Sequence, residues 1–264
     1  MPKTLAFGLS KPRAEASPYT RCAECPVRAM ALFSKVPAES LNWAQEYRRS
    51  QGALRAREHL FMQGERTEFV YTLFLGWMKI YKTSPSGRNQ ILRFALPGDF
   101  LGFQGDIGGP VGYSAQALTN CVVCAFPRNR IMELLGREPA IAAQLITMNA
   151  RSMSICQEYL LSSGARDTRE SIAFLLLELF HRLKIMQRFR PEPIEDNAVD
   201  IPITQDDIAE AVGVTPIHVN RILQQMKQDG LLRCANHRLE ILDEPALTKL
   251  AHFDPTSIGY SAMV

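Results

Sequence analysis

The chain has 264 residues, of which 46% are hydrophobic and 22% are charged, a composition typical of a globular protein with room for about two domains. Its net charge of +3 permits nucleic-acid binding but does not argue for it. No segment approaches the ~18 uncharged apolar residues needed to cross a membrane, and the basic residues at the N-terminus precede no apolar run, so we expect a cytoplasmic protein without membrane contact.

Residues 1–20 mix Pro, Ser, Ala and charged residues without periodicity, as is typical of a flexible tail. A compact Cys-bearing element is expected over Arg21–Phe33. From about Ala53 to Pro127, short apolar runs alternate with turn residues, and glycines recur every 11 or 12 residues. Short strands at such regular spacing predict a jelly-roll barrel, and we assign residues 21–135 to one domain.

After Pro139 the pattern becomes helical, because apolar residues recur three or four positions apart up to Gly164. A long helix with so narrow an apolar stripe is typical of a coiled-coil seam, so we interpret the stripe as a dimer interface. Its residues are Ile141, Leu145, Met148, Ser152, Ile155, Cys156 and Tyr159. Cys156 is interpreted as a packed core residue, with a redox-sensitive interface thiol as the alternative.

A second helix is predicted over Arg169–Lys184, so that the dimerisation segment occupies residues 136–186. Residues 187–200, which include two prolines, are interpreted as a linker. The rest of the chain is divided into a domain at 201–253 and a tail at 254–264.

The clearest motif spans Ile203–Arg233 and predicts two short helices followed by a β-wing. Thr204 and Thr215 are each placed to cap a helix, and Gly213 supplies the turn between the two helices. Pro216 stands at the first position of the second helix, where proline is well tolerated. Together these residues predict a winged helix-turn-helix.

The second helix of this motif has an apolar face and a polar face. The polar face carries Arg, Asn and Gln, which make bidentate contacts to guanine and adenine edges in the major groove. We predict that it reads DNA through Thr215, Pro216, Ile217, His218, Asn220, Arg221 and Gln224. A plain helical hairpin with a polar outer face is the alternative. Basic and acidic residues cancel within the motif, so affinity must depend on their placement and on two copies in a dimer.

The order of these parts resembles the CRP–FNR family of bacterial regulators over roughly residues 21–250. The glycine-spaced strands, the turn Gly98-Asp99-Phe100-Leu101-Gly102 and the stretch Ile203–Leu232 carry the resemblance. It implies an α+β fold with an N-terminal β-roll, a cyclic-nucleotide-binding-like jelly roll that acts as sensor, then a long dimerisation helix and a C-terminal winged helix-turn-helix. It also implies a homodimer that binds a palindromic operator in double-stranded DNA and recruits RNA polymerase.

The sequence departs from the family pattern at two sites, one that binds the cyclic nucleotide and one that reads the operator. Cyclic-AMP-binding members carry a Glu after the glycine turn and an Arg-Ser pair further on, where this chain has Phe103 and Tyr113-Ser114. Without a cation for the phosphate or a carboxylate for the ribose, cyclic-nucleotide binding is not expected. Many members also carry a cytosine-reading Glu where this chain has Ile217, which predicts a different half-site.

Four cysteines form two C-x₂-C pairs, Cys22 with Cys25 and Cys121 with Cys124, a set that could bind iron–sulfur or zinc. In the FNR branch an oxygen-labile [4Fe-4S] cluster uses N-terminal cysteines and one cysteine of the β-roll. The resemblance aligns Cys22, Cys25 and Cys124 with three of these ligands, while Ala31 replaces the remaining N-terminal one. Cys121 could supply the fourth thiolate, although residues i and i+3 of a regular strand point to opposite faces and a bulge would be needed.

The alternatives are a structural zinc site, a thiol switch, or no cofactor at all. The five histidines show no ligand spacing that would indicate haem. A thiol-disulfide oxidoreductase using Cys22 and Cys25 would need this motif between a strand and a helix, whereas an aperiodic tail precedes it. No nucleotide-binding glycine loop or Ser/His/Asp arrangement emerges, so we do not expect an enzyme.

Overall fold

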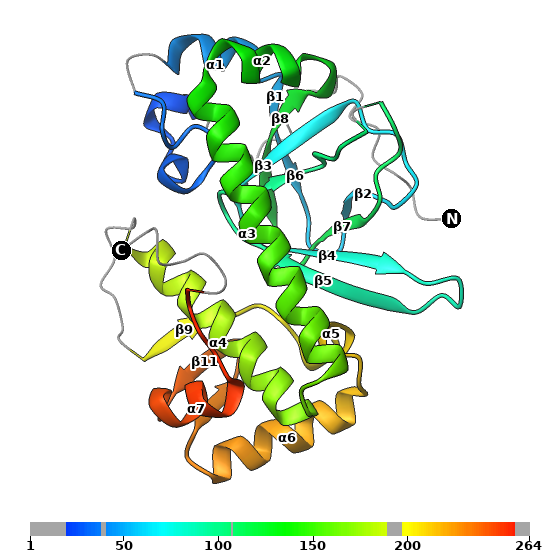
Figure 1. Ribbon diagram of the computed structural model, residues 1–264, viewed down its shortest axis with the longest axis vertical. Helices are drawn as coiled ribbons and strands as arrows, with labels where there is room; N and C mark the ends of the chain where they lie inside the picture. Colours follow the sequence, from blue (N-terminus) through cyan, green and yellow to red (C-terminus); the bar gives the residue numbers. More distant parts are fainter. Residues whose placement is uncertain (1–19, 38–40, 107, 189–196, 257–264) are drawn as a thin grey trace. The chain divides into compact units, whose positions relative to one another are not determined.

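The structure is a computed structural model that describes residues 20–37, 41–106, 108–188 and 197–256 (Figure 1). The chain divides into two compact units. The first comprises the described residues up to Arg88 together with Phe94–Asn149, and the second comprises Asn89–Arg93 and the described residues from Ala150 onward. The fold is α+β, as predicted. Most residues of the two expected tails (1–20 and 254–264) and of the expected linker (187–200) lie outside the described residues.

The predicted β-roll is built from two four-stranded sheets, with the orders β1-β8-β3-β6 and β2-β7-β4-β5. The strands are β1 (Ser50–Leu54), β2 (His59–Phe61), β3 (Phe69–Leu75), β4 (Met78–Thr83), β5 (Asn89–Ala95), β6 (Phe100–Leu101), β7 (Ser114–Ala117) and β8 (Cys121–Pro127). Their apolar residues meet between the sheets, where strands of both contribute to one core.

Strand β8 is buried on both faces because each face meets a different core. Cys121 and Val123 point into the core between the two sheets. Cys124 and Phe126 point into a second core, which forms on the outer face of the sheet. Successive side chains of a strand alternate between its faces, so two cysteines three residues apart end in different cores.

The second core is closed by the N-terminal element and by helices that follow β8. Among the elements that contribute residues to it are η1 (Cys22–Glu24), η2 (Arg28–Met30), α1 (Asn42–Tyr47), which precedes β1, and α2 (Ile131–Arg137). The short helix η4 (Arg128–Arg130) connects β8 to α2. The Tyr47 hydroxyl donates to the Glu133 carboxylate at 2.6 Å, and the Arg130 guanidinium lies 4.3 Å from the centre of the Tyr47 ring. These contacts of Tyr47, Glu133 and Arg130, which we call the polar clamp, join α1 to α2.

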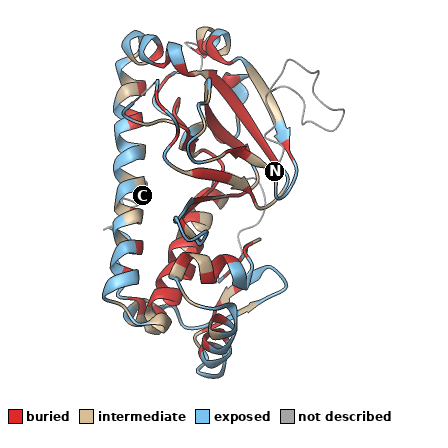
Figure 2. Cartoon of the chain, turned by 90° about the vertical axis from the view of Figure 1, so that its right-hand side faces the viewer, coloured by how far each residue is buried: buried red, intermediate tan, exposed pale blue. Residues whose placement is uncertain are grey.

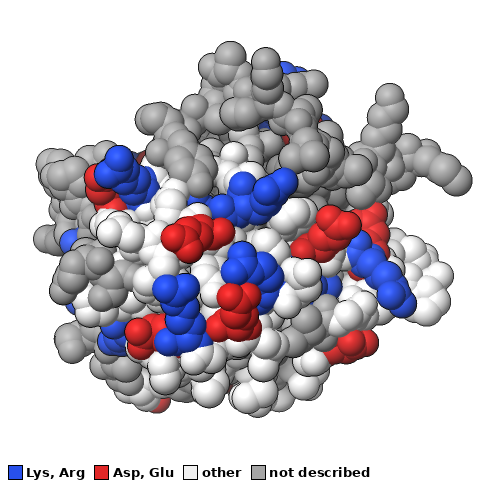
Figure 3. Space-filling model, turned by 90° about the horizontal axis from the view of Figure 1, so that it is seen from above, with Lys and Arg blue, Asp and Glu red and all other residues white. Residues whose placement is uncertain are grey.

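Acidic and basic side chains are interspersed on the face shown in Figure 3, without one large area of a single sign.

The second unit holds a three-stranded sheet of order β10-β11-β9 and the helices around it. Helix α3 runs continuously from the first unit into the second. The bounds are α3 (Pro139–Gly164), α4 (Thr168–Gln187), β9 (Ala198–Asp200), α5 (Gln205–Val212), α6 (Pro216–Gln228), β10 (Leu232–Ala235), β11 (Arg238–Ile241) and α7 (Glu244–Ala251).

Two expected domain boundaries are wrong. Ala198–Asp200, assigned to the linker, forms strand β9 and pairs with β11. Helix α4, assigned to the dimerisation segment, packs against α5, α6, α7 and β9 and therefore belongs with the C-terminal module. The strand was missed because three residues carry little periodic signal. Helix α4 was predicted as a helix, but its periodicity does not show which part of the chain packs against it.

The dimer stripe predicted on α3 is also wrong for most of its residues. Ile141, Leu145, Ile155 and Tyr159 are each at most 7% exposed, because they pack within their own chain. Met148 packs against the second core, and the Cys156 thiol faces the Leu92 carbonyl at 3.8 Å, which leaves Ser152 as a half-buried member of the set.

A different apolar stripe on α3 is open to solvent. Ile146, Met153 and Leu160 are 70%, 59% and 73% exposed and lie seven residues apart. Figure 2 shows pale blue along much of this helix. Both stripes have helical spacing, so periodicity alone did not distinguish the face packed inside the chain from the open one. Among the described residues, no helix is long and apolar enough to span a membrane.

Candidate functional site

Helix α5 begins and ends where its sequence predicts. The Thr204 side chain accepts a hydrogen bond from Asp207 N at 3.2 Å, and the Asp207 carboxylate accepts one from Thr204 N at 2.9 Å. This reciprocal capping box satisfies two amides of the first turn. The helix ends at Gly213, whose φ of +81° is a left-handed conformation that suits glycine.

Helix α6 follows after the turn and has one buried and one exposed face. Thr215 Oγ1 accepts from His218 N at 3.3 Å, and Pro216 occupies the first turn. Val219, Ile222, Leu223 and Met226 form the buried face. The opposite face is exposed and carries the residues predicted to read DNA, of which Thr215, Pro216, Ile217, Asn220, Arg221 and Gln224 are exposed and His218 is half-buried.

Two contacts position the polar groups of the exposed face. Arg221 Nη2 lies 3.1 Å from His218 Nδ1, one turn earlier on the same helix. The Gln205 amide donates from α5 to Asn220 Oδ1 at 3.3 Å. Ile217 stands at the start of this face and is 85% exposed.

The charges that cancel in the sequence are largely paired inside the module. Asp207 is engaged in the α5 cap, and Asp229 pairs with Arg169 of α4 at 2.6 Å. In the wing, Arg233 pairs with Glu240 at 3.1 Å. Arg221 has only a histidine ring as its described contact, so its positive charge is presented on the reading face.

Three of the predicted metal-ligating cysteines gather at a second site, between the N-terminal element and β8. Cys22 and Cys124 are buried and Cys25 is half-buried. Arg48, only 5% exposed, lies among them, with its Nη1 3.7 Å from Cys124 Sγ. All three thiols interact electrostatically with this guanidinium. We call these four residues the thiol cluster.

Burial controls the protonation of the thiol cluster. It raises the pKa of Cys22 and Cys124, and it raises the pKa of Cys25 to about 11. The positive charge of Arg48 opposes this effect for each thiol. At neutral pH the three groups are therefore protonated thiols beside a cation that would stabilise a thiolate.

Cys121 does not join the other three cysteines, so its prediction as a fourth ligand is wrong. Its thiol donates to the Trp77 carbonyl at 3.2 Å, inside the core between the sheets. The strand pairing from Cys121 to Ala125 with β1 is regular, so the bulge that would turn both sulfurs to one side is absent from that edge. Ala31, at the expected N-terminal ligand position, is buried and apolar.

Comparisons with known proteins match both units. The cyclic nucleotide-binding domain profile matches residues 52–138, and the Crp-like helix-turn-helix domain profile matches residues 170–250. The transcriptional activator FnrL of Cereibacter sphaeroides is 28% identical over 229 residues, covering 85% of this chain and 88% of FnrL. The nitrogen fixation regulation protein FixK of Bradyrhizobium diazoefficiens is 27% identical over 230 residues, covering 87% and 93% of the two chains. The solved structure of FixK2 from Bradyrhizobium japonicum aligns with a TM-score of 0.67 at 25% identity, over 76% of this chain and 96% of that one.

The chain belongs to the CRP–FNR family of DNA-binding transcription regulators. The relatives include the transcriptional activators FnrL and anr and the nitrogen fixation regulation protein FixK. The β-roll and the winged helix-turn-helix that the sequence predicts are thus confirmed as the two parts of a CRP–FNR regulator.

Two polar side chains of the β-roll, Tyr113 and Arg128, make hydrogen bonds to the backbone of the same domain. Tyr113, where cyclic-AMP-binding members have the phosphate-binding Arg, accepts a hydrogen bond through its hydroxyl from Gly102 N at 2.9 Å. Arg128 is buried and donates to the carbonyls of Gly102 at 3.0 Å and Gly109 at 3.3 Å. The expectation that cyclic nucleotides do not bind stays a prediction.

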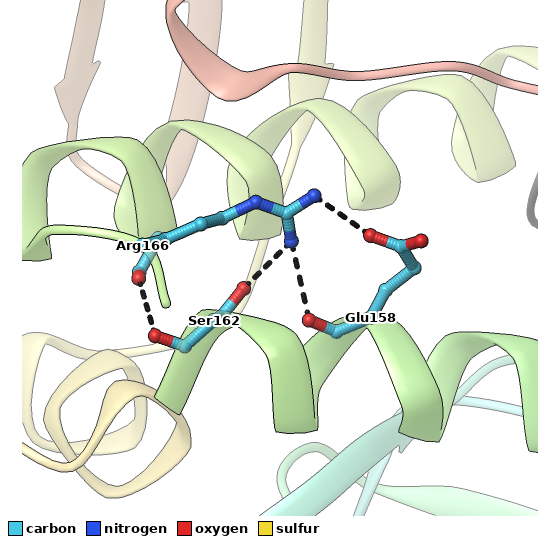
Figure 4. A network of polar contacts seen from close by, with 4 residues as sticks. Glu158, Ser162 and Arg166 are labelled. Atoms are coloured by element: carbon cyan, nitrogen blue, oxygen red, sulfur yellow. Dashed lines mark hydrogen bonds and ion pairs between the residues drawn. The ribbon is translucent and has the colours of Figure 1, made fainter. Parts of the chain in front are cut away.

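Sequence reasoning missed a set of polar contacts around Arg166, where α3 meets α4 in this CRP–FNR chain. We call this set the polar lock. Arg166 Nη2 pairs with the Glu158 carboxylate at 2.7 Å, and its Nη1 donates to Ser162 Oγ at 2.9 Å and to the Glu158 carbonyl at 3.2 Å (Figure 4). The guanidinium also lies 4.3 Å from the Phe174 ring centre of α4. Glu158 and Ser162 lie four residues apart on one face of α3, but Arg166 follows the end of the helix at Gly164, so helical spacing indicated only part of this network.

The burial of Arg48 in the thiol cluster had no signal in the sequence. The residue stands between Tyr47 and Arg49 in the sequence, and nothing in that context distinguishes a buried arginine from an exposed one. Only the packing of α1 against the β-roll brings its guanidinium to Cys124.

Proposed function

We propose that the protein regulates transcription as a homodimer that recognises a palindromic operator in double-stranded DNA through α6. The observation that carries this proposal is the exposed face of α6, where Asn220 and Arg221 are each held by a neighbouring side chain. Amide and guanidinium groups held in this way suit bidentate contacts to adenine and guanine. Recruitment of RNA polymerase is proposed from the family resemblance.

The homodimer is proposed to form along α3 through Ile146, Met153 and Leu160. Apolar residues seven apart form a straight seam on a helix, and a second copy of the same seam can cover it by knobs-into-holes packing. A two-fold dimer would then present two α6 helices to successive major grooves.

Operator recognition is tested by selecting bound sequences from random duplex DNA with the full chain. We expect enrichment of a two-fold symmetric site. Arg221→Ala should weaken binding to that site by roughly 1–3 kcal/mol and relax the preference at one base pair of each half-site. Unchanged affinity of this variant, or no enriched sequence with the wild-type protein, would contradict the assignment of α6.

A [4Fe-4S] cluster bound by four cysteine thiolates does not fit the residues present. Three thiols meet at the thiol cluster, Ala31 stands at the remaining N-terminal position, and Cys121 lies in another core. In the part of the chain that the structure describes, no group of three or more His, Cys, Asp or Glu side chains is arranged to hold a metal ion. The protein purified without oxygen is therefore expected to lack stoichiometric iron and sulfide. About four irons per chain would restore the cluster hypothesis.

We infer instead that the chain senses redox conditions through the thiols themselves. Oxidation by a hydroperoxide would join two sulfurs and break the O–O bond, with two electrons and two protons passing to the peroxide to give water and an alcohol. Burial raises the pKa of the Cys124 thiol, and the Arg48 charge beside it partly opposes this effect by stabilising the thiolate that such a reaction needs.

The sensing hypothesis is tested by measuring operator affinity and free thiols before and after hydroperoxide treatment. Cys124→Ser should abolish the response, whereas the matched variant Cys121→Ser, which replaces a thiol of the other core, should keep it. Equal operator affinity of oxidised and reduced wild-type protein would exclude a thiol switch while leaving the DNA-binding function intact.

A further inference from the structure

One apolar side chain interrupts the polar face of α6. Ile217 is 85% exposed, the largest exposed fraction among the large apolar side chains of the described residues. Covering an exposed isoleucine side chain removes apolar surface from water, so a surface that contacts it gains affinity. On a helix that enters the major groove, that surface belongs to DNA.

The local structure holds Ile217 in place. Pro216 before it has a fixed φ, and the Thr215 cap anchors the first turn through His218 N. A β-branched residue in a helix has one strongly preferred side-chain rotamer. Ile217 therefore presents a rigid apolar surface, whose ordering in a complex costs little conformational entropy.

The major groove offers one apolar group, the 5-methyl of thymine, and the N-terminal turns of a recognition helix lie against the base edges. We propose that Ile217 is a specificity residue that contacts a thymine 5-methyl in each half-site, an inference that rests on the proposed function of α6. The isoleucine has no hydrogen-bonding group, so cytosine, which presents an amino donor and no methyl, is disfavoured at the same position.

Arg221 places this thymine within the half-site. It lies four residues after Ile217 on the same face, which is about 6 Å along the helix axis at about 1.5 Å per residue. Successive base pairs are about 3.4 Å apart. The thymine contacted by Ile217 should thus lie one or two base pairs from the guanine contacted by Arg221, whose guanidinium is directed by His218.

The contact is tested with DNA in which single thymines of the selected half-site are replaced by deoxyuridine, which removes only the methyl group. For the wild-type chain we expect one replacement to weaken binding roughly fourfold per half-site, the effect of losing one buried methyl group. If deoxyuridine binds as well as thymine at every position, the proposal is wrong although the regulator function stands. If no sequence is enriched at all, the proposed function itself fails.

Variants separate Ile217 from other sources of a thymine preference. Ile217→Ala should bind thymine and deoxyuridine equally at the sensitive position, and Ile217→Glu should shift the preference there toward cytosine. Leu242→Ala, which removes another exposed apolar side chain from the same unit, should keep the fourfold discrimination. If Ile217→Ala, folded as judged by circular dichroism, still discriminates, another residue contacts the methyl and the proposal is overturned.

Discussion

Single residues in this protein act through the contacts that surround them, as Glu133 illustrates. Hydrogen bonds from Arg130, at 3.0 and 3.1 Å, and from the Tyr47 hydroxyl lower the pKa of the Glu133 carboxyl from its ordinary value of 4.5 to about 2. The clamp between α1 and α2 therefore depends on an ionised carboxylate.

The pH dependence of this clamp follows from the direction of the shift. Because the pKa is lowered in the folded protein, the stabilisation is fully present above pH 4.5 and is lost as pH falls through about 2. Glu133→Gln should thus be less stable than wild type at pH 6, with the difference in unfolding free energy vanishing toward pH 2. Denaturant unfolding at several pH values checks this. A difference that stays constant across the range would show that ionisation is not involved.

Gly213 makes the turn between α5 and α6 at a backbone conformation that other residues avoid. A Cβ there would have its nearest atom, Gln90 Oε1, at 3.9 Å, so Gly213→Ala introduces backbone strain without a clash. We expect a loss of about 1 kcal/mol in the free energy of unfolding. Gly136→Ala is the matched control, because Gly136 lies within α2 with open space around it and should gain about 0.5–1 kcal/mol. Thermal denaturation that gave the two variants the same sign would contradict this account.

At the level of elements, the lock around Arg166 joins α3 to α4. The side chains of Arg166 and Glu158 are 6% and 21% exposed, so their ion pair is shielded from water and salt. Arg166→Ala leaves a half-buried carboxylate without its cation and should cost about 2–3 kcal/mol. Arg233→Ala in the wing breaks a pair whose members are 56% and 30% exposed and should cost less than about 1 kcal/mol. Urea denaturation compares the two. Equal losses would mean that burial does not govern these pairs.

At the level of the whole molecule, the open seam on α3 predicts the oligomeric state. Met153→Lys places a charge at the centre of the seam and should shift the protein from dimer to monomer in sedimentation experiments. Thr147→Lys is the control, since Thr147 is exposed but lies about 100° around the helix from Ile146 and should leave the dimer intact. A monomeric wild-type protein, or a dimeric Met153→Lys, would refute the seam.

Much of the molecule was predictable from local patterns. The caps at Thr204 and Thr215, the turn at Gly213 and the exposed face of α6 depend on residues close in sequence, and the structure has them where they were expected. The regular spacing of the strands likewise predicted the β-roll, and the relatives confirm the family.

By itself, the sequence determined the order of the parts, the helix boundaries around the turn and the residue types on the reading face, because backbone preferences and capping act over a few residues. Tertiary structure alone decided which stripe of α3 faces the core, why Cys121 and Cys124 lie apart, and that Arg48 and Arg166 are buried. Each of these depends on which distant segment of the chain packs against a given face. The periodicity of a helix or strand shows that a face is apolar, but it does not show which segment will cover it.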